Sequence, residues 1–149
     1  MLRSRIRRRV AAADGFTLVE ILVVVLIIGI LAAIGIGGYL NQRSKAQDTQ
    51  AKTAAVTAVK AMMAWSTTHG DFADATPADL IRIEPALGQA AGLAVASDPD
   101  SFTVTVNSAS APGARFAIER DGTGAVTRTC TNHGRGSCLA APDSLGNRW

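Results

Sequence analysis

The feature that most constrains this chain is an uncharged, apolar stretch of twenty residues, Ile21–Leu40, close to the N-terminus. At a rise of 1.5 Å per residue, about 20 helical residues cross the roughly 30 Å hydrocarbon core of a bilayer. A helix also satisfies its own backbone hydrogen bonds in lipid. Between residues 16 and 40 the polar side chains are those of Thr17, Glu20 and Tyr39. The sequence therefore predicts a membrane-spanning helix over residues 16–40.

Positive charge is concentrated before this stretch. Five of the 15 Lys and Arg residues lie within the first nine positions, whereas residues 16–149 carry 10 basic and 11 acidic side chains. Because cationic flanks of a membrane helix stay in the cytoplasm, this bias places the N-terminus inside and everything after Leu40 outside. The basic sequence pI of about 9.3 thus indicates topology rather than a basic partner surface.

Small residues precede the apolar run instead of following it. A secretory signal has a shorter apolar core and is cleaved after that core. Here residues 11–15 (AAADG) come first, so cleavage there would remove the arginines and leave the anchor in place. The alternative on hydropathy alone is an uncleaved signal anchor.

Glu20 is the second unusual feature of the apolar segment. A carboxylate at the centre of a membrane helix costs about 2.5–3.5 kcal/mol on insertion scales, and such residues usually have a partner. Cleavage after Gly15 would create a positive amine on Phe16 that could pair with Glu20 of a neighbouring subunit. The alternative is an interfacial position, with the carboxylate among lipid headgroups.

The segment Gly15–Glu20 (GFTLVE), followed by the apolar run Ile21–Ile36, resembles the processing and anchor motif of the type IV pilin family. The resemblance extends over roughly the first fifty residues. It implies that a prepilin peptidase cuts between Gly15 and Phe16 and methylates the Phe16 amine. It also implies that Glu20 neutralises the Phe16 amine of an adjacent subunit during assembly.

Three parts of the chain follow from this resemblance. Residues 1–15 are expected to be a cleaved basic leader, and residues 16–40 a transmembrane and filament-core helix. Residues 41–149 are expected to form the amphipathic half of the helix and an extracytoplasmic globular head.

Two features depart from the family pattern. Many family members carry a proline in the helix, whereas this chain has Gly37, with Gly35 and Gly38 beside it. Each glycine weakens a helix interior by about 1 kcal/mol relative to alanine, so we expect this stretch to bend or unwind. Close helix packing is the alternative explanation. Asp14 stands where a basic or neutral residue is more usual.

The sequence after Leu40 predicts that the helix continues to about Ser66, since no Pro or Gly occurs before Gly70. An apolar stripe recurs at helical spacing and predicts the face that packs on a sheet. The residues of the stripe are Ala51, Ala55, Val59 and Met62. The residues expected on the opposite, exposed surface are Lys45, Asp48, Lys52 and Thr53.

Shorter elements follow this helix. Thr76 and Pro77 predict a capped helix over Pro77–Ile83. Alternation and turn residues predict three strands, with a turn at residues 121–124: Phe102–Val106, Arg115–Glu119 and Ala125–Thr129. The expected fold class is α+β, in which one long N-terminal helix, half transmembrane and half amphipathic, packs on a three- or four-stranded antiparallel sheet, as in pilins.

Cys130 and Cys138 enclose seven residues in a part expected outside the membrane. A disulfide is the favoured interpretation, with a stabilisation of roughly 2–3 kcal/mol from loop closure. A metal site that includes His133 is the alternative. In the family a disulfide commonly closes a C-terminal loop.

The chain has no pattern of nucleophile, base and orienting acid and no phosphate-binding loop, so we expect no enzymatic activity, cofactor or metal. We expect a structural subunit of a type IV pilus for adhesion, motility or DNA uptake. Before assembly it would be a single-pass protein of the cytoplasmic membrane, in contact with lipid, and afterwards part of an extracellular filament. The partners implied by the resemblance are other copies of the chain, the prepilin peptidase, and the pilus assembly platform and motor.

Two alternative functions remain open. One is a pseudopilin of a type II secretion system, which shares the N-terminal motif. The other is a minor tip pilin that binds a ligand or nucleic acid through a basic C-terminal surface, which contains Arg128, His133, Arg135 and Arg148.

Overall fold

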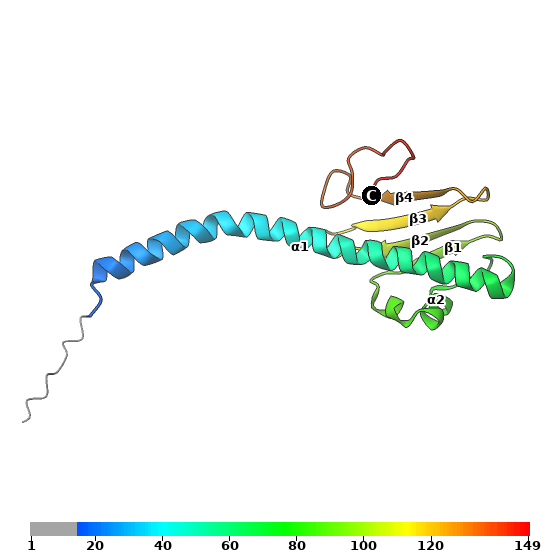
Figure 1. Cartoon of the computed structure of the whole chain (residues 1–149), viewed down its shortest axis with the longest axis horizontal. Helices are drawn as coiled ribbons and strands as arrows, with labels where there is room; N and C mark the ends of the chain where they lie inside the picture. The colour runs from blue at the N-terminus through cyan, green and yellow to red at the C-terminus, as the bar shows by residue number, and fades with distance from the viewer. Residues whose placement is uncertain (1–14) are drawn as a thin grey trace, which may run out of the picture. The chain divides into compact units, whose positions relative to one another are not determined.

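The computed structural model describes residues 15–149, so the predicted leader lies outside the described residues except for Gly15. The chain divides into a first unit that ends at Gly37 and a second unit, Gly38–Trp149. Helix α1, Leu18–His69, runs through both units (Figure 1). The two units are described separately below.

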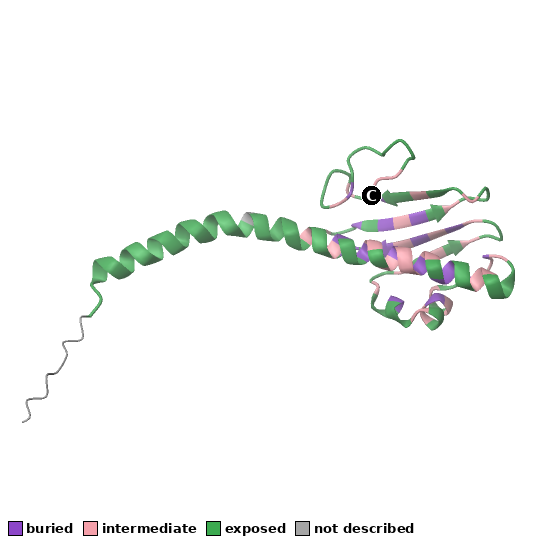
Figure 2. Ribbon diagram, viewed as in Figure 1, coloured by how far each residue is buried: buried purple, intermediate pink, exposed green. Residues whose placement is uncertain are grey.

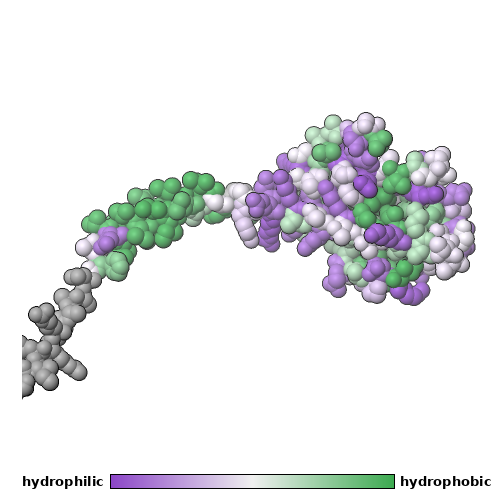
Figure 3. All heavy atoms as spheres, viewed as in Figure 1, coloured by the Kyte–Doolittle hydropathy of each residue, from purple (hydrophilic) through white to green (hydrophobic). Residues whose placement is uncertain are grey.

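In the first unit, α1 is apolar on every side. Each residue from Gly15 to Ile36 is exposed, as the continuous green of Figure 2 shows. Hydrophobic side chains cover this part of the helix in Figure 3. Its most apolar window has a mean hydropathy of 3.0, so by length and composition this helix can cross a membrane. A helix that is hydrophobic all round requires apolar surroundings.

In the second unit, α1 is amphipathic and buries one stripe of small residues. Met62 is fully buried, and it lies on the same face as four buried alanines: Ala51, Ala55, Ala58 and Ala61. The predicted apolar stripe is confirmed, with Val59 half-buried beside it. Alanine side chains let the helix backbone approach the sheet closely, so larger side chains from the strands fill the space between them.

The end of α1 and the next helix are set by local capping. Gly70 has a positive φ of 91°, and its N–H donates to the Ser66 carbonyl at 2.8 Å. The helix therefore ends at His69, three residues later than predicted. Helix α2, Pro77–Ile83, has the predicted bounds. The Thr76 hydroxyl accepts from the Asp79 N–H, and the Asp79 carboxylate accepts from the Thr76 N–H.

The sheet is a four-stranded antiparallel meander in the order β1-β2-β3-β4. A 3-10 helix, η1, Pro85–Gln89, precedes it. The strands are β1, Ala94–Ser97; β2, Phe102–Asn107; β3, Arg115–Arg120; and β4, Val126–Cys130. The three predicted strands are confirmed to within one residue at each end. Strand β1 was not predicted, and it is the fourth strand that the expected fold class allowed.

Two neighbouring core clusters join α1 to the sheet. Toward the end of α1, Met62 packs with Phe72 and with Phe102 of β2, together with Leu80 of α2 and Leu87 of η1. Nearer the start of the second unit, the second cluster contains Ala51, Ala55, Val106, Phe116, Ile118, Cys130 and Cys138. The head thus has one continuous α1–sheet interface, with α2 and η1 closing one side of it.

The C-terminal segment lies along the outer edge of β4. The Arg148 N–H donates to the Arg128 carbonyl at 2.8 Å, and the Asn147 side-chain oxygen accepts from the Arg128 N–H at 3.0 Å. The Trp149 indole N–H donates to the Thr129 carbonyl at 2.8 Å. Its ring meets Phe116 edge-on, with 5.7 Å between ring centroids. The tail therefore covers backbone groups that a last strand would otherwise expose.

The core gives a matched test in two adjacent methionines. Met62 is fully buried, whereas Met63 is 38% exposed. Met62→Ala should lower the free energy of unfolding of the detergent-solubilised chain by about 2–5 kcal/mol, because it leaves a cavity between α1 and the sheet. Met63→Ala is the control, and denaturant titration followed by tryptophan fluorescence measures both. Equal losses for the two variants would contradict this packing.

Candidate functional site

The predicted processing site lies just before α1. Gly15 and Phe16 are both exposed, with 79% of Phe16 accessible. Thr17 and Glu20 begin the helix as a capping pair: the Glu20 N–H donates to the Thr17 hydroxyl at 3.2 Å, and the Thr17 N–H donates to the Glu20 carboxylate at 3.4 Å. Glu20 therefore has hydrogen-bond partners within its own chain. A negative side chain at this end of a helix is also favoured by the helix dipole.

The glycine-rich stretch lies inside α1, which is helical through Gly35, Gly37 and Gly38. A Cβ atom at Gly35 or Gly38 would meet no other atom within 4 Å. The packing of this chain therefore does not require glycine at these two positions. Flexibility of the stretch stays a prediction, as does close packing against another molecule.

Asp48 on α1 is a buried carboxylate of the head, only 2% exposed, and its partners come from two distant loops. One carboxylate oxygen accepts from the Ser108 hydroxyl at 2.7 Å. The other accepts from the Ser137 N–H at 2.8 Å and from the Ser137 hydroxyl at 3.2 Å. Asp48 thus joins the helix to the loop between β2 and β3 and to the loop closed by the two cysteines.

Lys52 completes this arrangement one helical turn after Asp48. Its ammonium group donates to the Ser137 carbonyl at 2.9 Å and lies 5.1 Å from the centroid of the Phe116 ring. It also lies 5.5 Å from the Trp149 ring. Asp48 and Lys52 therefore hold Ser137 by its N–H, its hydroxyl and its carbonyl. We call these three residues the helix–loop clamp.

The prediction that Asp48 and Lys52 belong to an exposed face was wrong for Asp48 and only partly right for Lys52, which is half-buried. The partners of Asp48 come from residues 60 and 89 positions further along the chain. Helical periodicity predicts which residues share a face, but it contains no information on distant loops that cover that face. One local feature could have indicated the burial of Asp48: it is an isolated acid that lies one helical turn before Lys52 and beside the apolar stripe.

Gly136 lets the loop approach the clamp. It has a positive φ of 59°, and a Cβ atom there would overlap an Asp48 carboxylate oxygen. Any larger residue would both strain the backbone and push the carboxylate away. The close approach of loop and helix thus depends on a glycine at this position.

The Cys130–Cys138 disulfide is confirmed, with 5.9 Å between the two Cα atoms. In this structure the two sulfur atoms are bonded to each other, so they are not the free thiolates that the alternative metal site with His133 would require. The disulfide holds the loop that carries Ser137, and Cys138 is itself buried against α1. The bridge and the helix–loop clamp therefore fix the same loop from two sides.

Burial and hydrogen bonding act in opposite directions on Asp48. Burial raises the pKa of its carboxyl group, but hydrogen bonds from Ser110, Ser108 and Ser137 outweigh burial and hold the pKa below its ordinary value. Burial lowers the pKa of the Lys52 ammonium, and the nearby Asp48 charge partly offsets this effect. The clamp is therefore built for an ionised Asp48.

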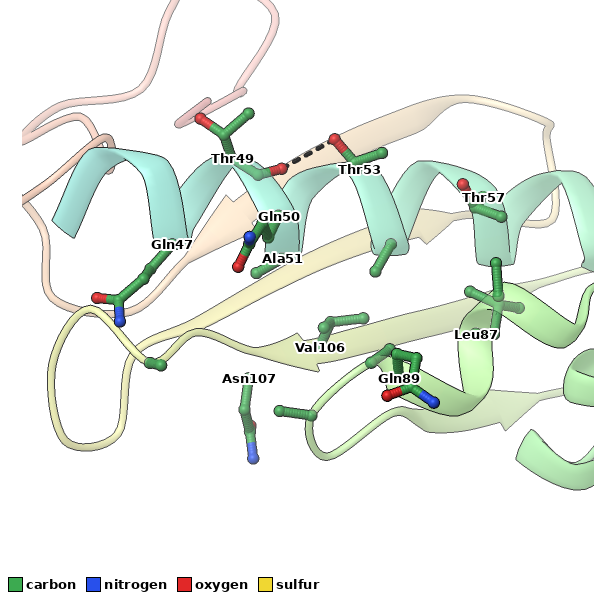
Figure 4. Close-up of a pocket in the computed structure, with 15 residues that line it drawn as sticks. Gln47, Thr49, Gln50, Ala51, Thr53, Thr57, Leu87, Gln89, Val106 and Asn107 are labelled. Carbon is green, nitrogen blue, oxygen red and sulfur yellow. Dashed lines mark hydrogen bonds between the residues drawn. The ribbon is translucent and has the colours of Figure 1, made fainter. Parts of the chain in front are cut away.

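A hollow of about 510 Å³ lies on another side of the head, between α1, η1 and the end of β2. Figure 4 shows that amide side chains from these three elements surround it, among them Gln50, Gln89 and Asn107. The Thr53 hydroxyl donates to the Thr49 carbonyl at 2.9 Å, so it is already satisfied within α1. Alanine methyl groups and Leu87 supply the apolar lining. The hollow offers hydrogen bonds and apolar contact but no ionisable group.

The basic residues assigned to a nucleic-acid surface have different surroundings. The Arg148 guanidinium donates to the Ala140 carbonyl at 3.0 Å, and the Arg128 guanidinium lies 5.5 Å from the centroid of the Trp149 ring. Arg135 and His133 are exposed in the disulfide loop. Two of the four residues therefore also hold the C-terminal segment in place, and nucleic-acid binding stays a prediction.

Comparison with known proteins gives two findings. Residues 11–36 match the model for the prokaryotic N-terminal methylation motif. The chain is also similar to the type IV major pilin protein PilA of Myxococcus xanthus (strain DK1622), with 41% identity over 63 residues. This match spans 40% of the present chain and 29% of the relative. The family model thus covers the N-terminal motif, and the match to the pilin covers less than a third of that protein.

The clamp predicts that acid destabilises the head through Asp48. Because its pKa is lower in the folded than in the unfolded chain, the carboxylate stabilises the fold above about pH 4 and loses this effect as the pH falls through the folded pKa. In Asp48→Asn the side-chain NH2 group would face the Ser108 or the Ser137 donors and could accept no hydrogen bond from them. The substitution should therefore lower the free energy of unfolding by about 1–3 kcal/mol at neutral pH.

Denaturant titrations across this pH range measure both effects. The free energy of unfolding of Asp48→Asn should fall less steeply with acid than that of the unchanged chain. Asp98→Asn, at an exposed position, is the control. Parallel pH dependences for Asp48→Asn and the unchanged chain would contradict the clamp.

Proposed function

We propose that this chain, a member of the type IV pilin family by its methylation motif, its pilin relative and its α+β fold, is a structural subunit of a type IV pilus. The observation that carries the proposal is the GFTLVE motif at the start of a helix that is apolar from Ile21 to Ile36 and then continues as the amphipathic helix of the head. Soluble proteins rarely expose an apolar surface as large as this part of the helix, so the surface indicates contact with lipid or with other protein.

The exposed apolar half of α1 supports assembly in which contact with neighbouring copies replaces contact with lipid. Before assembly, lipid would cover residues 16–40. In a filament, the same surface of neighbouring copies would replace lipid, so apolar contact is kept throughout. The head would remain outside the filament core, because its surface mixes polar and charged side chains (Figure 3).

Glu20 supports a second step, the setting of register between copies. Prepilin peptidase would cut between Gly15 and Phe16, methylate the new amine and leave it one residue before the Thr17 cap. In the single chain the Glu20 carboxylate is held by Thr17. During assembly it would turn to the Phe16 amine of an adjacent copy, because a full charge partner in an apolar core is stronger than long hydrogen bonds to Thr17.

The pilus is favoured over a secretion pseudopilus by the disulfide-closed C-terminal loop and by a relative that is itself named a major pilin. A pseudopilin of a type II secretion system shares the N-terminal motif, and its location separates the two functions. A pilus subunit would occur in long surface fibres, and a pseudopilin would be confined to the cell envelope.

Mass spectrometry of fibres sheared from the cell surface tests processing and location together. The expected result is a mature chain that begins at methylated Phe16. A chain that retains Met1, or the absence of this protein from the fibres, would overturn the proposed function.

Substitution of Glu20 by alanine tests its part in assembly. Glu20→Ala should insert into the membrane in normal amounts, while fibre yield drops by at least about tenfold, since a charge pair in an apolar core is lost. Glu84→Ala, a carboxylate removed from the head, should leave fibre yield unchanged. Normal fibres from Glu20→Ala would remove the assembly role from this residue.

A further inference from the structure

Acidic side chains gather at one end of the head. This end is formed by the turn after α1, the β1–β2 turn and the β3–β4 turn. The Phe72 N–H donates to the Pro99 carbonyl at 3.1 Å, and the Arg120 guanidinium donates to the Asp100 carbonyl at 2.7 Å. The three turns are thus held together. The six acids in these turns or at the adjoining end of β3, which we call the acidic pole, are Asp71, Asp74, Asp98, Asp100, Glu119 and Asp121.

Basic side chains gather at the opposite end of the strands. Here the beginning of α1 in the second unit meets the disulfide loop, since Asn41, Ser44 and Arg135 line one small hollow of about 190 Å³. Arg115 begins β3 at the same end, and its N–H donates to the Thr131 hydroxyl at 2.9 Å. The five cations at this end, which we call the basic pole, are Arg43, Lys45, Arg115, Arg135 and Arg148.

The charges of the two poles are not neutralised within their own chain. Among residues 15–149 the single ion pair is Asp79–Arg82, on α2 between the poles. At the acidic pole, Arg120 is the accompanying cation, and it lies over the Phe72 ring. At the basic pole, Asp48 is buried and already accepts three hydrogen bonds. Each pole therefore presents unpaired charge of one sign to its surroundings.

We propose that the basic pole of one copy docks on the acidic pole of the next copy. Residues 41–149 carry 10 basic and 10 acidic side chains, so the separation of charge is not a consequence of net charge. Arg115 and Glu119 lie on the same strand, about 13 Å apart at roughly 3.3 Å per residue. Because the poles are at opposite ends of the strands, the contact is head-to-tail and repeats from copy to copy without closing.

A second copy fits these observations better than an anionic membrane surface. Anionic headgroups would attract the basic pole but leave the acidic pole without a partner. Another copy supplies both signs of charge in matching positions, and like poles repel, so only one orientation is favoured. This proposal deepens the proposed function, since it names the surfaces through which the heads of neighbouring subunits meet.

Charge reversal in the full-length chain, purified in uncharged detergent, tests the proposal. Basic-pole reversal is Arg115→Glu with Arg135→Glu, and acidic-pole reversal is Asp98→Lys with Glu119→Lys. The four side chains are exposed, and Asp100 is left in place because Arg120 donates to its carbonyl. Sedimentation measures self-association at about 0.01 M and about 1 M salt, where the screening length falls from about 30 to about 3 Å.

Each paired reversal should weaken self-association at low salt by about tenfold, because two attractive contacts become repulsive. Each paired variant keeps one pole unchanged, so an equimolar mixture of the two variants should associate more strongly than either alone, through the unchanged basic pole of one and the unchanged acidic pole of the other. High salt should weaken association of the unchanged chain and of this mixture alike. Lys60→Glu with Glu84→Lys, on the flank of the head, is the control and should leave association unchanged.

Failure of the mixture to associate more strongly than either variant alone would overturn the proposal, provided that both variants unfold as cooperatively as the unchanged chain. A salt-independent association, or an equal loss in the control, would also overturn it. If anionic lipid is the partner, the basic-pole reversal will lose vesicle binding while the mixture of variants gains no association over either variant alone, and the proposal falls. Self-association in detergent does not depend on processing of Phe16, so the proposed function can fail while this contact is retained.

Discussion

The side chains of helix α1 require two different environments along its length, and the arrangement of the other elements depends on this constraint. As far as Ile36 the helix is apolar on all sides, and from Ala51 to Met62 it is apolar on one side only. The second part needs a protein surface of its own, and the meander sheet with α2 and η1 provides it. The small alanine stripe then requires bulky partners, which Phe102, Val106 and Phe116 supply.

The helix–loop clamp adds specificity to this hydrophobic contact. An apolar stripe on a sheet tolerates sliding and rotation, since the hydrophobic effect is not directional. A buried carboxylate with three donors tolerates neither, because any shift of α1 leaves charge without hydrogen bonds. Asp48 thus fixes the register of the helix on the sheet and the position of the disulfide loop with a single side chain. Its contribution is to the uniqueness of the fold as much as to its stability.

Local signals in the sequence were sufficient for some elements and insufficient for others. Helix α2 could be predicted to the residue because Thr76, Pro77 and Asp79 form its cap within four positions. Strand β1 (AVAS) is short, weakly alternating and half-exposed, so its pairing with β2 decides its conformation and no local pattern reveals it. Asp48 could not be assigned for the same reason, since its partners lie on distant loops. The cap formed by Thr17 and Glu20 was also not predicted, although the T-x-x-E pattern is a local capping signature.

The C-terminal segment along β4 has a consequence for the proposed assembly into a filament. An open strand edge is a template for strand addition, which leads to amyloid-like aggregates or swapped dimers. At one edge of the sheet, Asn147, Arg148 and Trp149 already occupy the backbone groups of β4. At the other edge, β1 is only four residues long. In the proposed filament, copies of the chain would therefore associate through the helix and the head without competing strand addition at the sheet edges.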